Sequence, residues 1–207
     1  MQGRGLPLLL SALLVIAPSL VLAGAQREED LSASVQAALH AAVADMAAPE
    51  PLFQSPDERQ RWLGLMSERL AKRIPNQRER EDLLLTVYYE AQRAGLDPQL
   101  VLGLIQIESG FRKYAISGAG ARGLMQVMPF WTKAIGTPDH NLFHLRTNLR
   151  YGCTILRHYL DIEKGNLFRA LGRYNGSLGQ AAYPNAVHAA WQKQWSYTPG
   201  ALAQAGR

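Results

Sequence analysis

Hydrophobic residues recur at helical spacing along most of the chain, and no segment shows the strict alternation of a half-buried strand. Two such stripes precede residue 77, the second of them after Ser55-Pro56-Asp57-Glu58, which has the form of a helix start. Pro49 and Pro51 separate the two. The stripes consist of Leu31, Val35, Leu39, Val43 and Met46, and of Trp62, Met66 and Leu70. We therefore predict two helices between residues 27 and 74, which could pack on the domain, dock a partner or form a stalk.

The same periodicity continues to the end of the chain, interrupted by loops rich in glycine and polar residues. Helices are predicted at about 77–94, 97–110, 149–160, 167–174 and 186–195, with a short helical piece ending at Ile135 and loops at 110–123 and 137–146. The last of these helices is expected to begin after Pro184. The pattern as a whole predicts a mainly α-helical fold.

The first 25 residues read as a signal peptide. Arg4 gives a basic start, residues 6–22 are apolar, and Ala23-Gly24-Ala25 has the small-x-small form of a cleavage site. Pro7 and Pro18 favour removal over an uncleaved membrane anchor, which is the alternative. We expect export to the periplasm and no transmembrane helix in the mature form.

Composition adds few constraints to this picture. The formal net charge is +5, or +4 once Arg4 is removed, and the charges are scattered, which argues against nucleic acid as a partner. A single cysteine, Cys153, excludes an intrachain disulfide and is expected to be a small buried hydrophobe. We divide the chain into a signal peptide (1–25), an N-terminal helical extension (26–76), the main domain (77–197) and a flexible tail (198–207).

The segment at 97–110 places one carboxylate at the end of an apolar helix. Asp97-Pro98 provides an N-cap followed by a proline at the first helical position, and Gly110 can end the helix in a left-handed conformation. One stripe of this helix contains Val101, Leu104, Ile105 and Glu108. The acid therefore points toward the core or a cleft wall, unless it swings into solvent as most glutamates at helix ends do.

A carboxylate in that position is poorly solvated, and the unpaired carbonyls at the helix C-terminus disfavour a second negative charge. Both effects favour the protonated form of Glu108. This is the state that a general acid needs near neutral pH.

Three other motifs point to different chemistry and are rejected. The glycines in 118–123 fit G-x-G-x-x-G, but no predicted strand precedes them, which argues against dinucleotide binding. His140 and His144 are four residues apart but lie in a predicted loop, and there is no H-E-x-x-H sequence. Ser109 lacks a G-x-S-x-G context.

Acidic residues are absent from the stretch that follows Glu108. None occurs from residue 109 to residue 138, and the next are Asp139, Asp161 and Glu163. Glycoside hydrolysis normally uses two carboxylates across the scissile bond. If this protein cleaves a sugar polymer, one glutamate would have to act twice.

Three sequence motifs, in this order, resemble the signatures of the soluble lytic transglycosylase (SLT) catalytic domain. They are Glu108-Ser109, the run Gly118-Ala119-Gly120-Ala121-Arg122-Gly123-Leu124-Met125-Gln126-Val127-Met128-Pro129, and Arg173-Tyr174-Asn175-Gly176. The similarity spans about residues 83–195. It implies a goose-type lysozyme-like helical fold and action on peptidoglycan, without a cofactor or metal.

The resemblance also implies a mechanism. Glu108 would protonate the bond between MurNAc and GlcNAc and then take the proton of the MurNAc C6 hydroxyl, which closes a 1,6-anhydro ring. The implied substrate-binding residues are Ser109, which could instead only cap the helix, Gln126 and Asn175 through their amides, Met128 as an apolar wall, and Tyr174, which would also hydrogen-bond Glu108.

Two alternatives remain at this point. A lysozyme-type hydrolase would use Glu108 and a water held by Asp139 or Asp161, and an inactive protein would only bind peptidoglycan. The expected partner is the glycan strand of peptidoglycan, and residues 26–76 are a candidate surface for an envelope protein.

Overall fold

The computed structural model describes residues 26–44 and 53–198 of the 207-residue chain. Its elements are α1 (Ala33–Ala44), α2 (Pro56–Leu70), α3 (Gln77–Arg93), α4 (Pro98–Glu108), α5 (Phe130–Ile135), α6 (Leu145–Ile162), α7 (Leu167–Asn175), α8 (Ala182–Ala190) and a π-helical turn, η1 (Trp191–Trp195). The described residues form no strand, only isolated bridges that join Arg122 to Ile116 and to Val127. The predicted mainly helical fold class is confirmed.

Several predictions fall on residues that lie outside this description. They are the signal peptide at 1–25, Met46, Pro49 and Pro51 in the N-terminal extension, and the tail from residue 199 onward. Across 26–44 and 53–198, no helix is both long and apolar enough to cross a membrane.

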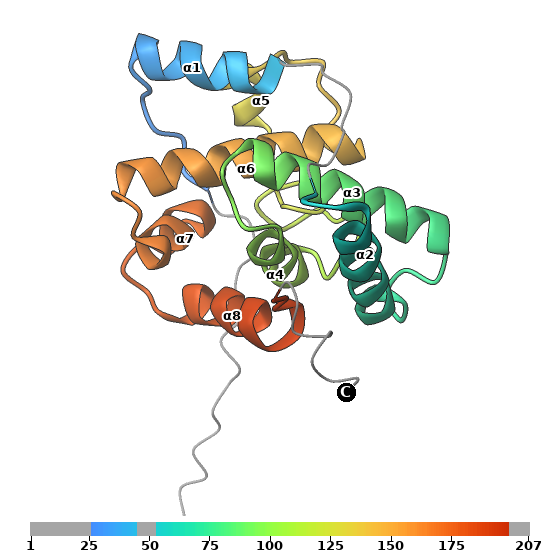
Figure 1. Cartoon of the computed structure of the whole chain (residues 1–207). Helices are drawn as coiled ribbons and strands as arrows, with labels where there is room; N and C mark the ends of the chain where they lie inside the picture. The colour runs from blue at the N-terminus through green and yellow to red at the C-terminus, as the bar shows by residue number, and fades with distance from the viewer. Residues whose placement is uncertain (1–25, 45–52, 199–207) are drawn as a thin grey trace, which may run out of the picture.

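Helix α4 lies at the centre of the molecule, between α6 and α8 in the view of Figure 1, and it packs against α3, α8 and η1. Its ends form as the sequence predicts. The Asp97 side chain accepts a hydrogen bond from the backbone N–H of Gln99, Pro98 occupies the first turn, and Gly110 ends the segment with a φ of 58°. Since most of this helix is buried, Glu108 at its end is carried into the protein interior.

The absence of a side chain at Gly103 allows another part of the backbone to approach α4 closely. A Cβ atom at this position would lie 2.8 Å from the backbone nitrogen of Trp191, the first residue of η1. Backbone cannot move aside as the end of a flexible side chain can, so this contact requires glycine. The contact holds η1, and with it α8, against the central helix.

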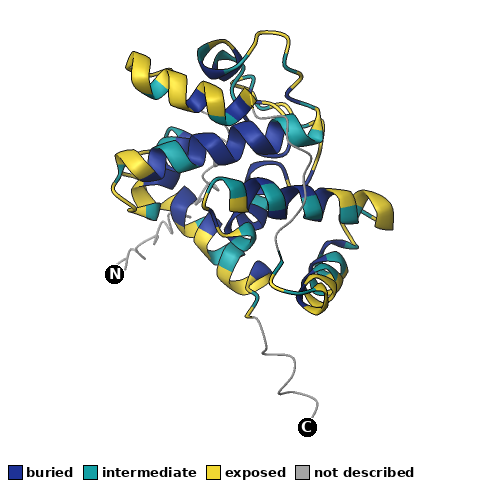
Figure 2. Ribbon diagram, turned by 45° about the horizontal axis from the view of Figure 1, so that its top comes forward, coloured by how far each residue is buried: buried dark blue, intermediate teal, exposed yellow. Residues whose placement is uncertain are grey.

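Helix α6 forms the other main support of the domain. It packs against α3 and α7, and Figure 2 shows it buried along most of its length, with Cys153 inside as predicted. The helices of the N-terminal extension cover neighbouring surfaces, since α1 packs on α5 and α6, and α2 packs on α3. Both helices therefore pack on the domain, which is one of the three roles that the sequence left open, while docking of a partner stays a prediction.

Two helix boundaries differ from the prediction. Helix α6 begins at Leu145, four residues earlier than expected, and α8 begins at Ala182 although Pro184 was expected to precede it. Proline is compatible with a first helical turn because the N–H groups of that turn have no partner within the helix. This earlier start places Tyr183 on α8.

A buried ion pair joins α3 to α6. Arg150 Nη2 donates to Glu90 Oε1 at 2.8 Å, and Arg150 Nε lies 3.1 Å from Oε2, with both side chains almost fully buried. Two further arginines, Arg93 and Arg146, approach the same carboxylate at 3.8 and 3.6 Å. A buried carboxylate with these cations around it is costly to disturb, because its removal leaves positive charge without a partner.

We predict that Glu90→Ala lowers the free energy of unfolding by about 3–5 kcal/mol, since it leaves Arg150 buried and unpaired. Urea denaturation measures this change. The exposed pair of Arg157 with Asp161 is the matched control, and Asp161→Ala should cost no more than about 1 kcal/mol. Equal losses in the two variants would contradict the structural role of the buried pair.

Candidate active site

Glu108 is the last residue of α4, and only 4% of its surface is exposed. The Tyr183 hydroxyl of α8 donates a hydrogen bond to its Oε1 at 2.5 Å. Its Oε2 is buried and has no hydrogen-bond partner in the described part of the chain. Glu108 is therefore a buried carboxyl group in which one oxygen accepts a hydrogen bond and the other makes none with the described residues.

Burial raises the pKa of Glu108 to about 8, and the hydrogen bond from Tyr183 only partly opposes this effect. The expectation that the acid is buried is confirmed, and its raised pKa favours the protonated form near neutral pH. No other carboxylate of the described residues contributes to the shift. A proton held at this pKa can be donated and recovered near neutral pH, as general acid and base catalysis requires.

The expected hydrogen bond from Tyr174 to Glu108 is wrong. The Tyr174 hydroxyl donates instead to the backbone carbonyl of Met125 at 2.7 Å. Tyr174 lies on α7, beside the loop that contains Met125, whereas the oxygen of Glu108 faces α8. Tyr174 is near enough for Glu108 to influence its pKa, so it belongs to the surroundings of the acid without holding it.

The sequence analysis did not identify Tyr183 as a partner of Glu108, because it placed the start of the last helix after Pro184. Burial and the nearby Glu108 raise the pKa of Tyr183 well above its usual value, so its hydroxyl remains a donor. The available signal was the ability of proline to occupy a first helical turn, which allows a helix to start before it. No local pattern pairs this tyrosine with Glu108, 75 residues away.

The loop beside the acid is fixed by a buried asparagine of α6 that the sequence analysis also missed. Asn148 accepts a hydrogen bond from the N–H of Met125 at 2.8 Å and donates to the carbonyls of Arg122 and Leu142. A polar residue on the inward stripe of a helix was the only sequence signal for this role. The bonds to Met125 and Arg122 attach the loop to α6, and the bond to Leu142 attaches the segment that precedes α6.

The side chain of Gln126 makes hydrogen bonds within this loop. Its amide nitrogen donates to the carbonyls of Ala115 and Gly123, and its φ of 49° is unusual for a residue with a side chain. Such a conformation costs about 1–3 kcal/mol and persists where the surroundings impose it. Both amide hydrogens are used within the loop, and substrate binding by Gln126 stays a prediction.

The other predicted substrate-binding residues are buried or partly buried. Ser109 is buried at the C-cap of α4, where its hydroxyl donates to the carbonyl of Ile105, which is the capping alternative. Asn175 is buried at the last position of α7. Met128 is partly buried and packs against the core. The three come from separate segments: the end of α4, the end of α7 and the loop before α5.

One residue from the N-terminal extension also reaches this loop. The side-chain oxygen of Gln26 accepts hydrogen bonds from the backbone N–H of Met128 at 3.3 Å and from the indole N–H of Trp131 at 3.1 Å. Its amide nitrogen lies 3.5 Å from the carbonyl oxygen of Gln126. Gln26 is as buried as Glu108.

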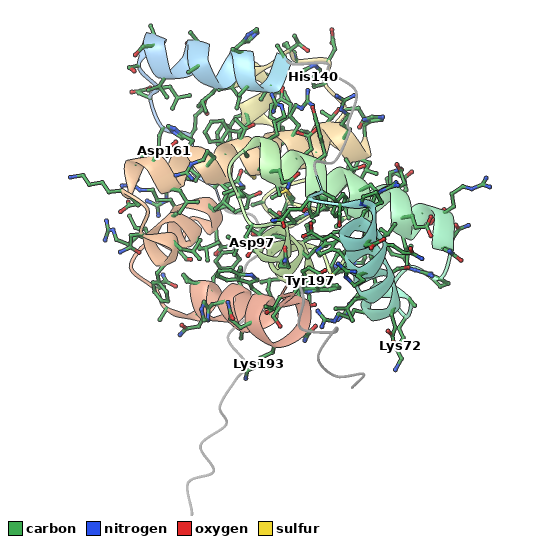
Figure 3. The ribbon with its side chains drawn as sticks, viewed as in Figure 1. Lys72, Asp97, His140, Asp161, Lys193 and Tyr197 are labelled. Carbon is green, nitrogen blue, oxygen red and sulfur yellow. The ribbon has the colours of Figure 1, made fainter. Side chains whose placement is uncertain are left out.

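The two histidines considered for metal binding serve other purposes. His140 Nδ1 is hydrogen-bonded to the Tyr151 hydroxyl at 2.7 Å, and His144 is the N-cap residue of α6. Figure 3 shows His140 on the side of the molecule that carries α1 and α5, whereas α8 lies on the opposite side. Among the residues described, no three metal-ligating side chains form a group.

The sequence is similar to those of known proteins and matches one family model. The family model described as "Transglycosylase SLT domain" matches residues 86–194. The transglycosylase of Enterobacteria phage PRD1 is 38% identical over 109 residues, 49% of this chain and 40% of that protein. Membrane-bound lytic murein transglycosylase C of Haemophilus influenzae is 62% identical over 39 residues, 19% of this chain and 11% of that protein.

A solved structure of an inactive mutant of lytic transglycosylase Slt from Pseudomonas aeruginosa covers 72% of this chain and 33% of that one, with 20% identity and a TM-score of 0.41. The chain thus spans less than half the length of each of these relatives.

We predict that Tyr183→Phe raises the pKa of Glu108 further above its value of about 8, because the hydrogen bond that opposes the effect of burial is lost. Carbon-13 NMR of the labelled carboxyl group measures the titration directly. The matched control is Tyr174→Phe, which removes a hydroxyl bonded to Met125 and should shift this pKa less. A larger shift in the control would contradict the assignment of Tyr183.

A second prediction concerns stability and pH. Above about pH 4.5 the unfolded chain releases the Glu108 proton, whereas the folded protein keeps it up to about pH 8. The free energy of unfolding therefore falls as pH rises through this window. Glu108→Gln stays neutral, so it should be more stable than the parent at pH 8 by an amount on the order of a few kcal/mol, and similar to it near pH 4. Thermal unfolding at the two pH values tests this, and an equal difference at both would contradict it.

Proposed function

The chain belongs to the Transglycosylase SLT domain family, whose model covers more than half of it, and on this basis we propose that the protein is a peptidoglycan lytic transglycosylase. The names of its relatives, a transglycosylase and a membrane-bound lytic murein transglycosylase, support this reaction and this polymer. Because peptidoglycan lies outside the cytoplasm, the proposal includes export to the periplasm through residues 1–25.

The first step of the proposed reaction is proton donation by Glu108. The carboxyl transfers its proton to the oxygen that links C1 of MurNAc to C4 of GlcNAc, and the bond from C1 to this oxygen breaks. The N-acetyl oxygen of MurNAc stabilises the positive charge that develops at C1. The GlcNAc unit leaves with a free C4 hydroxyl.

In the second step the same carboxylate acts as a base. It takes the proton from the C6 hydroxyl of MurNAc while the oxygen of that hydroxyl bonds to C1 and closes the 1,6-anhydro ring. Glu108 returns to its protonated form, and no water is consumed. An attacking group within the same sugar has a high effective concentration, so no protein base is needed to position a water molecule.

The observation that carries this proposal is the isolation of Glu108. The two carboxyl groups of a glycoside hydrolase stand about 5–10 Å apart. At such a distance a second carboxylate in the interior would raise the pKa of Glu108 by repulsion. For the described residues, burial and Tyr183 account for the shift without any other acid.

The rival hydrolase would require Asp139 or Asp161 to hold a water molecule at Glu108. The Asp161 carboxylate is largely exposed at the end of α6 and pairs with Arg157 at 2.6 Å. Asp139 is the neighbour of His140, which lies across the molecule from α8. Neither acid is placed to serve Glu108, which favours the reaction that needs only one carboxylate.

We predict that the purified protein releases muropeptides with 1,6-anhydroMurNAc ends from isolated peptidoglycan. Mass spectrometry of products formed in ¹⁸O-labelled water identifies the reaction, since a transglycosylase incorporates no label and a hydrolase adds one labelled oxygen. Glu108→Gln should reduce product formation by at least about 100-fold, because the amide can neither donate nor accept the catalytic proton.

Asp139→Asn and Asp161→Asn are the matched controls, and both should retain the parental rate. Labelled reducing ends, or loss of activity in either aspartate variant, would overturn the proposal in favour of the hydrolase. Absence of any product with glycan still bound would favour the inactive binding protein.

A further inference from the structure

The chain that precedes α1 makes an unusual contact with the candidate active site. Residues 27–30 are exposed, whereas Gln26 is only 4% exposed and reaches between α5, α7 and the loop around Met128. Figure 1 shows this segment crossing α6 on its way from α1 toward α7. A long polar side chain is rarely buried this completely unless a matching polar site receives it.

The groups that receive Gln26 form such a site. Its carbonyl oxygen has two donors, the N–H of Met128 and the indole of Trp131, and its nitrogen faces the carbonyl of Gln126. The Gln26 side chain also lies near Tyr174, whose hydroxyl donates to the carbonyl of Met125 in the same loop. Tyr174 is in turn close enough to Glu108 for that carboxyl to influence its pKa, so Tyr174 links the Gln26 site to the surroundings of Glu108.

A primary amide resembles the acetamido group of an amino sugar in its hydrogen bonding. Each presents one carbonyl acceptor and at least one N–H donor on the same planar unit. A site with two donors for the oxygen and one acceptor for the nitrogen therefore suits either group. The Gln26 side chain occupies a position that an N-acetylated sugar could use.

A second contact fixes the same segment. Glu29 Oε1 lies 3.2 Å from Arg173 Nη1, and Arg173 directly precedes Tyr174 on α7. Glu28, one residue earlier, is exposed. The segment is thus attached at two points, by the amide of Gln26 and by the carboxylate of Glu29.

We propose that residues 26–29 are an internal competitor of the substrate, in which the Gln26 amide occupies the place of a substrate acetamido group and must leave before glycan binds beside Glu108. This inference rests on the proposed function, which supplies the N-acetylated glycan.

Competition of this kind has a defined kinetic signature. The apparent affinity for glycan is reduced by the fraction of molecules in which the segment is displaced. The reaction itself occurs only after displacement, so the rate at saturating substrate is unaffected. Release of the segment should lower KM and leave kcat unchanged.

Binding of tri-N-acetylchitotriose, an unreactive N-acetylated oligosaccharide, tests the competition by calorimetry in the Glu108→Gln background. Gln26→Ala should tighten binding by about fivefold to tenfold, since it removes the hydrogen bonds that hold the segment in place. Unchanged or weaker binding would overturn the proposal, because Gln26 would then be a structural or substrate-binding residue. Circular dichroism of the variant establishes that it is folded.

Glu29→Gln provides a second variant that leaves the buried amide untouched. It should tighten binding by about twofold, as expected for a partly exposed ion pair, while the matched control Glu28→Gln should have no effect. An equal effect of the two substitutions would overturn the role of the Glu29 contact in holding the segment.

Turnover of peptidoglycan by Gln26→Ala, with Glu108 intact, separates this inference from the proposed function. A lower KM with unchanged kcat and anhydro products supports both. Anhydro products with an unchanged KM would overturn the competition and leave the function standing. Hydrolytic products with a lower KM would overturn the function and leave the competition standing, since the segment would still compete with glycan.

Discussion

The structure depends on keeping one neutral carboxyl group in the interior at the end of an apolar helix. An ionised carboxylate could not remain there without a cation, and no cation contacts Glu108 among the described residues. The protein instead supplies burial, which keeps the proton on the group, and one phenol, which fixes Oε1. The result is a carboxyl group whose raised pKa favours the protonated form near neutral pH.

This arrangement is built by helix packing. Gly103 lets the backbone of η1 lie directly against α4, and η1 continues α8, which carries Tyr183. The buried pair of Glu90 and Arg150 ties α3 to α6, while Asn148 of α6 fastens the loop that contains Met125. The acid and the loop beside it are therefore positioned by different helices.

The N-terminal extension also contributes to the packing of the domain. Its helices α1 and α2 share the hydrophobic core with the main domain. The segment ahead of α1 adds polar contacts at the loop and at α7, through Gln26 and Glu29. The N-terminal extension thus packs on the main domain and also contacts the loop around Met128 and α7.

The sequence by itself determined what depends on neighbours along the chain. The caps at Asp97 and Gly110, the stripe that turns Glu108 inward and the helical class all follow from spacing of a few residues. Tertiary structure alone decided which groups meet: Tyr183 rather than Tyr174 at the acid, Asn148 at the loop and Gln26 against Met128. The physical reason is that periodicity defines the face on which a residue lies, whereas its partner across 23 to 102 residues depends on how complete helices pack.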